Sequence, residues 1–250
     1  MTAKPPQFDS MPRTADAPAA AADFARRLVP CWQQALGPEL LGVYLIGSLA
    51  HGGFSARYSD VDIAVITDKG LSPQALERAK AAAVALSADW GSKLSVFWTD
   101  RGFTAGRFPP LDRTDYLDHA IPLVEGERVR PARPTLKDIQ DYLGGAPFAG
   151  WAEQARRFAN AETLEPKDRK AYLRTLLYPA RFCFSWLTGR MGSNDQAVAF
   201  LADAHLHGLD VSLLDRALKC RQADADPDPL FVERTALPSQ VEACSLLIAR

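Results

Sequence analysis

The sequence predicts a small mixed α/β domain followed by an all-helical domain. Two short apolar runs, 41–46 (LGVYLI) and 63–66 (IAVI), flank a loop that contains glycines, and a third run, 93–99 (KLSVFWT), follows a helical stretch. Apolar runs of this length, bounded by Gly, Ser and Asp, are typical of buried strands. From Thr135 onward, apolar residues recur at helical spacing instead. We therefore assign residues 17–132 to the α/β domain and residues 133–250 to the helical domain.

The first domain is expected to contain two long helices beside its strands. Residues 1–16 are rich in proline and small polar residues, which indicates a mobile tail. A helix is expected over 18–36, and a second over 73–87, where Ser72 and Pro73 are a typical N-cap and first helical residue. Residues 121–124 are expected to add an edge strand. Five prolines between Asp100 and Pro134 argue against any long regular element there.

The second domain is expected to consist of six helices. Their predicted ranges are 136–143, 151–160, 166–188, 193–206, 212–223 and a last helix after Pro238. Pro179 falls inside the third of these ranges. Because proline has no N–H to donate and its ring clashes with the preceding turn, we expect it to kink or split that helix.

The composition excludes several classes of partner. The chain has 29 basic and 30 acidic residues, whereas a protein that grips nucleic acid needs a basic face. The four cysteines are widely separated, without the spacing of a metal or redox site. No apolar run approaches the roughly 18 residues that a membrane span needs, and no secretory signal is evident. We expect a cytoplasmic protein, a monomer or weak homodimer, that binds neither nucleic acid nor membrane.

The loop between the first two strands carries the strongest functional pattern. Gly47-Ser48 is followed, after ten residues, by Ser59-Asp60-Val61-Asp62 at the start of an apolar run. Residues two apart on a strand point to the same side, so Asp60 and Asp62 should project together. Paired carboxylates of this kind suit Mg²⁺, which completes its shell with water and substrate phosphate. A glycine followed by a serine allows close approach of a phosphate.

This pattern resembles the signature of the polymerase-β-like nucleotidyltransferase superfamily. In the second half, Ala180-Arg181-Phe182, then Leu187-Thr188-Gly189, then Ser193-Asn194-Asp195, is similar to the helical domain of streptomycin/spectinomycin-type aminoglycoside adenylyltransferases. The resemblance implies a nucleotidyltransferase fold with a helical domain. It also implies transfer of a nucleotidyl group, AMP from ATP with Mg²⁺, to a hydroxyl of a small-molecule acceptor, with pyrophosphate as the leaving group.

The resemblance also assigns roles to individual residues. Asp60 and Asp62 match the catalytic carboxylates that hold the metal ions. The expected nucleotide-binding residues are Gly47, Ser48, Ser59, Arg181 and Asn194. Arg181 matches an arginine of the helical domain that reaches the phosphates across the cleft, a role that suits the planar guanidinium.

Two departures from the family pattern put catalysis in question. The third carboxylate, which activates the acceptor hydroxyl, is expected on the next strand, but Leu94-Ser95-Val96 has serine there. The lysine expected before Asp195 is Asn194. Without a general base the rate typically falls roughly a hundred- to ten-thousand-fold. The alternative reading is therefore a catalytically impaired nucleotide-binding or regulatory protein, unless a carboxylate from the region 100–127 replaces Ser95.

Other polar residues leave two readings open. The acidic run Asp112, Asp115, Asp118, Glu125 and Glu127 could face a cationic aminocyclitol substrate, or could form a solvated acidic surface. His51, in the glycine loop, could contact a phosphate or substrate, or could be exposed. His119, His205 and His207 form no metal-ligand pattern with carboxylates.

Overall fold

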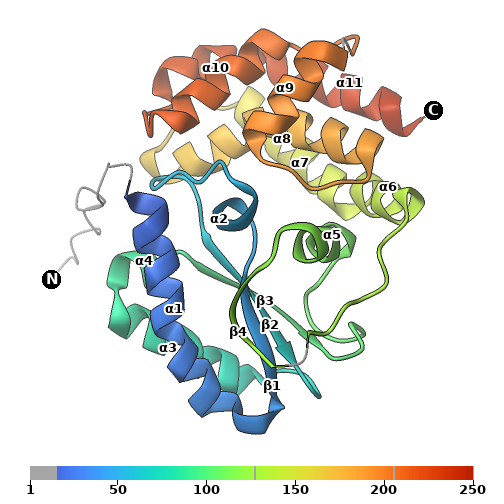
Figure 1. Ribbon diagram of the computed structural model, residues 1–250. Coiled ribbons are helices and arrows are strands. Elements are labelled where there is room, and N and C mark those ends of the chain that lie inside the picture. Colours follow the sequence, from blue (N-terminus) through green and yellow to red (C-terminus); the bar gives the residue numbers. More distant parts are fainter. Residues whose placement is uncertain (1–15, 127, 205, 250) are drawn as a thin grey trace, which may run out of the picture.

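The computed structural model describes residues 16–126, 128–204 and 206–249, and it confirms the predicted fold class (Figure 1). A four-stranded mixed sheet lies in the first half, and from Leu136 onward every regular element among the described residues is a helix. Apart from Asp16, the predicted mobile tail lies outside the described residues, as do Glu127 and His205. No helix among the described residues is long and apolar enough to span a membrane.

The sheet has the strand order β3-β2-β1-β4. The strand β2 pairs antiparallel with β1 and parallel with β3, and β1 pairs antiparallel with the edge strand β4. In the parallel ladder Asp62 is the partner of Ser95. The predicted metal-binding carboxylate is therefore next to the serine that stands where a third carboxylate was expected. The strands are β1 (Leu40–Leu45), β2 (Val61–Thr67), β3 (Leu94–Asp100) and β4 (Ile121–Glu125).

Helices cover both faces of the sheet. On one face, α1 and α3 pack apolar side chains such as Phe24 and Ala79 against Val43, Val61 and Val65. The other face carries Tyr44, Ile46, Ala64 and Ile66, which pack with Phe103, Phe108 and Tyr116. The helices of this half are α1 (Ala17–Leu36), which continues into the 3-10 turn η2 (Gly37–Glu39), then α2 (Ser48–His51), α3 (Pro73–Leu86), α4 (Ala88–Ser92) and α5 (Pro110–His119).

The helix α5 contradicts the expectation that the proline-rich region 100–134 lacks long regular structure. Pro109 is the N-cap of α5 and Pro110 is its first residue, positions at which the missing N–H is not needed. The next proline, Pro122, lies on the edge strand β4, where it interrupts no helix. The prolines therefore bound this helix instead of preventing it.

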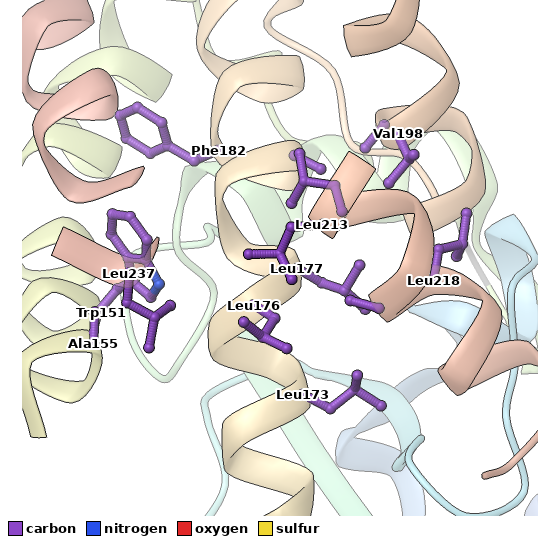
Figure 2. Packing of buried hydrophobic residues seen from close by; sticks show 14 of the residues in the cluster. Trp151, Ala155, Leu173, Leu176, Leu177, Phe182, Val198, Leu213, Leu218 and Leu237 are labelled. Atoms are coloured by element: carbon purple, nitrogen blue, oxygen red, sulfur yellow. The ribbon is translucent and has the colours of Figure 1, made fainter. Parts of the chain in front are cut away.

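The second half is a bundle built around the long helix α8. Figure 2 shows Leu173, Leu176 and Leu177 of α8 between Trp151 and Ala155 on one side and Leu213 and Leu218 on the other. The second predicted helix of this half begins five residues earlier than expected, at Ala146. The helices are α6 (Leu136–Gly144), α7 (Ala146–Ala159), the turn η3 (Pro166–Asp168), α8 (Arg169–Thr188), α9 (Asn194–Ala204), α10 (Val211–Gln222), the 3-10 segment η4 (Asp228–Ala236) and α11 (Leu237–Ile248).

The helix α8 runs through Pro179 without being split, so that part of the prediction is wrong. Proline at position 179 leaves the carbonyl of Thr175, four residues earlier, without its helical donor. The indole N–H of Trp151 on α7 donates to this carbonyl at 3.0 Å. A buried carbonyl that would otherwise be unpaired is thus satisfied by the neighbouring helix, which makes the proline tolerable inside α8.

Candidate active site

A cleft of about 710 Å³ lies between the sheet half and the helical half. Both walls carry residues that the sequence singled out: Asp60 and Asp62 come from the sheet half, and Arg181 comes from α8. Gly47, Ser48, Ser59, Ser95 and Asn194 also line this cleft. The structure therefore brings all the predicted site residues together, although they come from four separate segments of the chain.

The carboxylate pair lies at the start of β2. Val61 between them is fully buried in the core under α1 and α3, so Asp62 faces the opposite side, towards α5. Burial raises the pKa of Asp62 to about 6, and the negative charge of Asp60 adds to the rise, while a hydrogen bond from Ser95 opposes it. The Asp60 carboxylate accepts a hydrogen bond from the ammonium of Lys170 on α8 at 2.6 Å. The ammonium of Lys170, from the helical wall, therefore already neutralises the charge of one of the two carboxylates, that of Asp60.

The glycine of the Gly-Ser motif is required by its surroundings. Gly47 has φ +65°, a conformation that L-residues rarely adopt. A Cβ at this position would lie 2.4 Å from Asp62 Oδ2. The Gly47 N–H donates to the Asp115 carboxylate at 2.7 Å. Gly47 therefore lies between Asp62 on β2 and Asp115 on α5, and its close approach to Asp62 leaves no room for a side chain.

The two serines of the motif meet an arginine that the sequence analysis missed. The Ser48 hydroxyl donates to Ser59 Oγ at 3.1 Å. Arg221, on α10, donates to the same Ser59 oxygen at 2.7 Å and lines the cleft. Its Nε is buried without a hydrogen-bond partner among the described residues. No local motif marks Arg221, because its position depends on how α10 packs against the glycine loop.

The remaining predicted residues of the helical half lie at the junction of α8 and α9. The Arg181 guanidinium lies near enough to Asp62 to lower its pKa, and its Nη2 contacts the sulfur of Met191 at 3.8 Å. Asn194 is the first residue of α9, directly after Ser193, whose hydroxyl accepts the N–H of Gln196. Asn194 lines the cleft at the place where the family pattern expects a lysine.

The acidic run divides into residues that face the cleft and residues that do not. Asp112 and Asp115, on α5, line the cleft. Asp118 forms an ion pair with Arg133, and Glu125 accepts a hydrogen bond from the Tyr44 hydroxyl. The run is therefore not one acidic surface: two of its members belong to the site.

The two carboxylates of α5 that line the cleft differ in their partners. Asp115 is almost completely buried and accepts hydrogen bonds from the Gly47 N–H and the His119 ring. Asp112 makes no hydrogen bond or ion pair with any residue that the structure describes. Burial raises the pKa of Asp112 to about 7, and the charges of Asp115 and Asp62 add to the rise. Asp112 is thus a free carboxylate inside the cleft.

His51 also lines the cleft and is not simply exposed. Its Nδ1 lies 3.1 Å from the Gly52 carbonyl, so the tautomer with a proton on Nδ1 fits this contact. Burial lowers the pKa of His51, against the opposing effect of the Asp115 charge. The ring meets that of His119 edge to face, with centroids 5.7 Å apart.

The residues at the start of β2 fit a divalent cation that also contacts a ligand. Among the described residues no three His, Cys, Asp or Glu side chains form a complete metal site. Two carboxylates are nevertheless what Mg²⁺ commonly takes from a protein, with water and phosphate oxygens as its other ligands. The raised pKa of Asp62 comes first from burial, but the Asp60 charge adds to it, and Lys170 contacts Asp60, so positive charge beside the pair is favourable. The facing guanidinium of Arg181 suits the phosphates of such a ligand.

The fold is similar to that of a spectinomycin adenyltransferase, AAD(9) from Enterococcus faecialis, whose structure contains ATP and spectinomycin. The match covers 91% of this chain and 99% of that chain, with a TM-score of 0.64 and 10% sequence identity. At this identity the similarity establishes the fold alone, and it confirms the resemblance expected from the motifs at that level.

The other comparisons with known proteins support no inference about this chain. A mutant of the toxin–antitoxin pair MntA-HpeT matches 41% of this chain and 74% of its own, with 21% identity and a TM-score of 0.32, too low to support an inference. No family model matches the sequence. No curated protein matches it at a significant level.

Proposed function

We propose that this protein transfers AMP from ATP with Mg²⁺ to a hydroxyl of a small acceptor. The observation that carries the proposal is the placement of Asp60 and Asp62 opposite Arg181 in one cleft. The similarity in fold to AAD(9), solved with ATP and spectinomycin, supports it. We also propose that residues 17–132 and 133–250 are the two domains and that the nucleotide lies between them.

The proposed roles follow from charge and position. Asp60 and Asp62 would hold Mg²⁺, which when bound neutralises charge on the phosphates and favours in-line displacement. The hydroxyls of Ser48 and Ser59 lie beside this pair; Ser59, which accepts from Ser48 and Arg221, keeps its own proton for a phosphate oxygen, and Ser48 could donate to one by turning away from Ser59. Three further side chains that line the cleft would act on the polyphosphate, by charge or by hydrogen bonding: Arg181, Arg221 and Asn194.

The acceptor is proposed to be a neutral or anionic hydroxylated molecule. The part of the cleft wall that comes from the described helical half contains no carboxylate. Its charged residues are all basic: Lys170, Arg174, Arg181 and Arg221. Arg174 forms no ion pair with any described residue, so it is available to an anionic group. A polycationic acceptor bound against this wall would meet these positive charges and no carboxylate of the same wall.

A second candidate function is nucleotide binding without efficient transfer. Two observations favour it: Ser95 stands where a carboxylate is expected, and the Lys170 ammonium already occupies one side of Asp60. Such a protein would bind ATP and act as a regulatory or storage module. Gel filtration checks the expectation of a monomer or weak homodimer.

The test measures ATP binding and pyrophosphate release separately. Isothermal titration of ATP with and without Mg²⁺ gives the affinity, and pyrophosphate release is followed with water, myo-inositol, adenosine and spectinomycin as acceptors. The proposal predicts Mg²⁺-dependent binding and turnover that is faster with an added acceptor than with water alone. Binding without turnover would support the second function. Absence of Mg²⁺-dependent ATP binding would contradict both.

A further inference from the structure

We propose that Asp112, on α5, takes the proton from the acceptor hydroxyl and replaces the catalytic carboxylate that is missing at Ser95. The inference rests on the proposed nucleotidyl transfer and names a group that the sequence motifs do not identify. It would move the base from the strand β3 to a helix on the same side of the sheet.

Ser95 itself does not suit the role. It is the partner of Asp62 in the ladder between β2 and β3, and its hydroxyl donates a hydrogen bond to the Asp62 carboxylate. Its proton is therefore engaged with a group that must stay available to a cation. An alcohol cannot act as a general base near neutral pH, because the group that accepts a proton must have a pKa near the working pH.

Among the carboxylates of α5, the free one is Asp112. Asp115 is held by the Gly47 N–H and the His119 ring, and Asp118 is held by Arg133. Asp112 lines the cleft without a hydrogen bond or ion pair to any described residue. A desolvated carboxylate without a partner is costly to keep ionised unless a ligand interacts with it. The environment that raises its pKa to about 7 also suits a proton acceptor at neutral pH.

The groups that face Asp112 come from every surrounding element. Two carboxylates, of which Asp115 acts more strongly than Asp62, raise its pKa, and two guanidinium groups, of Arg107 before α5 and Arg181 on α8, lower it. Tyr142 on α6 lies within electrostatic range of Asp112. The Tyr178 hydroxyl on α8 also lines the cleft, buried and without a hydrogen-bond partner among the described residues. The neighbourhood thus offers aromatic faces and unpaired polar groups to an acceptor.

In the proposed step, one oxygen–phosphorus bond forms while another breaks. The acceptor hydroxyl transfers its proton to the Asp112 carboxylate while its oxygen forms a bond to the α-phosphorus of ATP. The bond between the α-phosphorus and the bridging oxygen of the β-phosphate breaks, and its electron pair leaves with pyrophosphate. Asp112 then releases the proton to solvent. Arg181, which lies within electrostatic range of Asp112, is suited to hold the phosphates beside the attacking oxygen.

The test compares Asp112→Asn with Asp118→Asn, an acidic residue of the same helix that does not line the cleft. Pyrophosphate release from Mg–ATP is measured with water as the acceptor and with myo-inositol, adenosine and spectinomycin. Asp112→Asn should lower kcat about 10²- to 10⁴-fold, the usual contribution of a general base, while ATP affinity changes less than about threefold. It should also remove the rise of kcat with pH that an ionising base produces. Asp118→Asn should leave kcat, ATP affinity and this rise unchanged.

A rescue variant separates proton transfer from binding of the acceptor. Ser95→Glu in the Asp112→Asn background returns a carboxylate to the strand beside Asp62, and it should restore turnover at least tenfold if the lost function was proton transfer. Unchanged turnover in Asp112→Asn would overturn this inference and leave the proposed function standing. A raised KM with unchanged kcat would also overturn it, because Asp112 would then only bind the acceptor. A parent protein without any turnover would contradict the proposed function itself, and this inference with it.

Discussion

Replacing Asp62 with asparagine should stabilise the metal-free protein while abolishing its response to Mg–ATP. The pKa of Asp62 rises from 3.8 to about 6, first because of burial and then because of the Asp60 charge. Since each pH unit between native and unfolded values corresponds to about 1.4 kcal/mol, this rise destabilises the ionised native state by at most about 3 kcal/mol. The asparagine amide is also partly desolvated, so a gain of roughly 1–3 kcal/mol is expected.

The sign of the pH dependence follows from the direction of the shift. Because the native pKa is the higher one, the unfolded chain loses its proton first as pH rises, and the native state becomes less stable. The penalty is absent below about pH 4, grows between about pH 4 and 6, and is complete above that range. The advantage of Asp62→Asn should therefore be present at pH 8, about half as large at pH 5, and lost in stronger acid.

Thermal unfolding in EDTA at pH 5 and pH 8 measures this effect. For a chain of this length, a gain of roughly 1–3 kcal/mol corresponds to roughly 2–10 °C in Tm. Asp60→Asn is the matched control, since Asp60 is 40% exposed and paired with Lys170, and little net change is expected. Addition of Mg–ATP should raise the Tm of the parent but not of Asp62→Asn. If Asp62→Asn is less stable than the parent at pH 8 in EDTA, the pair has a structural role and the reasoning fails.

Three further changes test other parts of the structure. Gly47→Ala should destabilise the protein by roughly 1–3 kcal/mol and weaken Mg–ATP binding, because a Cβ there is strained and meets Asp62; urea unfolding and ATP titration check both. Trp151→Phe should cost roughly 1–3 kcal/mol by leaving a buried carbonyl unpaired, and Pro179→Ala should recover part of that loss in a double-mutant cycle by supplying a new amide N–H. His119 has its pKa raised by a hydrogen bond to a buried carboxylate, so its contribution to stability is present below about pH 6.5 and lost as pH rises through the native pKa. Replacing it with glutamine should flatten the stability profile over this range.

The sequence was sufficient to predict features that depend on neighbouring residues alone, such as which side chains of a strand face the core. The period of two along β2 places Val61 in the core and Asp62 on the opposite face, as the structure shows. Glycine at position 47 was expected to allow close approach of a phosphate, whereas the structure shows that only glycine fits beside the Asp62 carboxylate. Strand order was harder to predict, since pairing is set by contacts between segments that lie far apart in the sequence.

The errors arose where proline was read as a breaker. Pro109 and Pro110 initiate α5, and the signal was available, since proline at the first helical position followed by an aspartate in the first turn is a typical helix start. Pro179 was different. Its tolerance depends on the indole N–H of Trp151 from another helix, a tertiary contact that no local pattern reveals. The same holds for Arg221, whose place beside Ser59 comes from packing of α10.

The departures at Ser95 and Asn194 must be judged together with the other charged residues that line the cleft. The motif lacks one carboxylate and one cation, while the described cleft contains one free carboxylate, on Asp112, and several cations outside the motif, among them Lys170 and Arg221. Charge in a site acts through space, so a group need not enter from the same element to serve the same function. A reading of the motif alone predicts impairment, whereas the geometry supplies the missing charges from α5, α8 and α10. Under the proposed function, catalysis depends on Asp112. The variant Asp112→Asn, alone and combined with Ser95→Glu, tests whether the base has moved to α5 or has been lost.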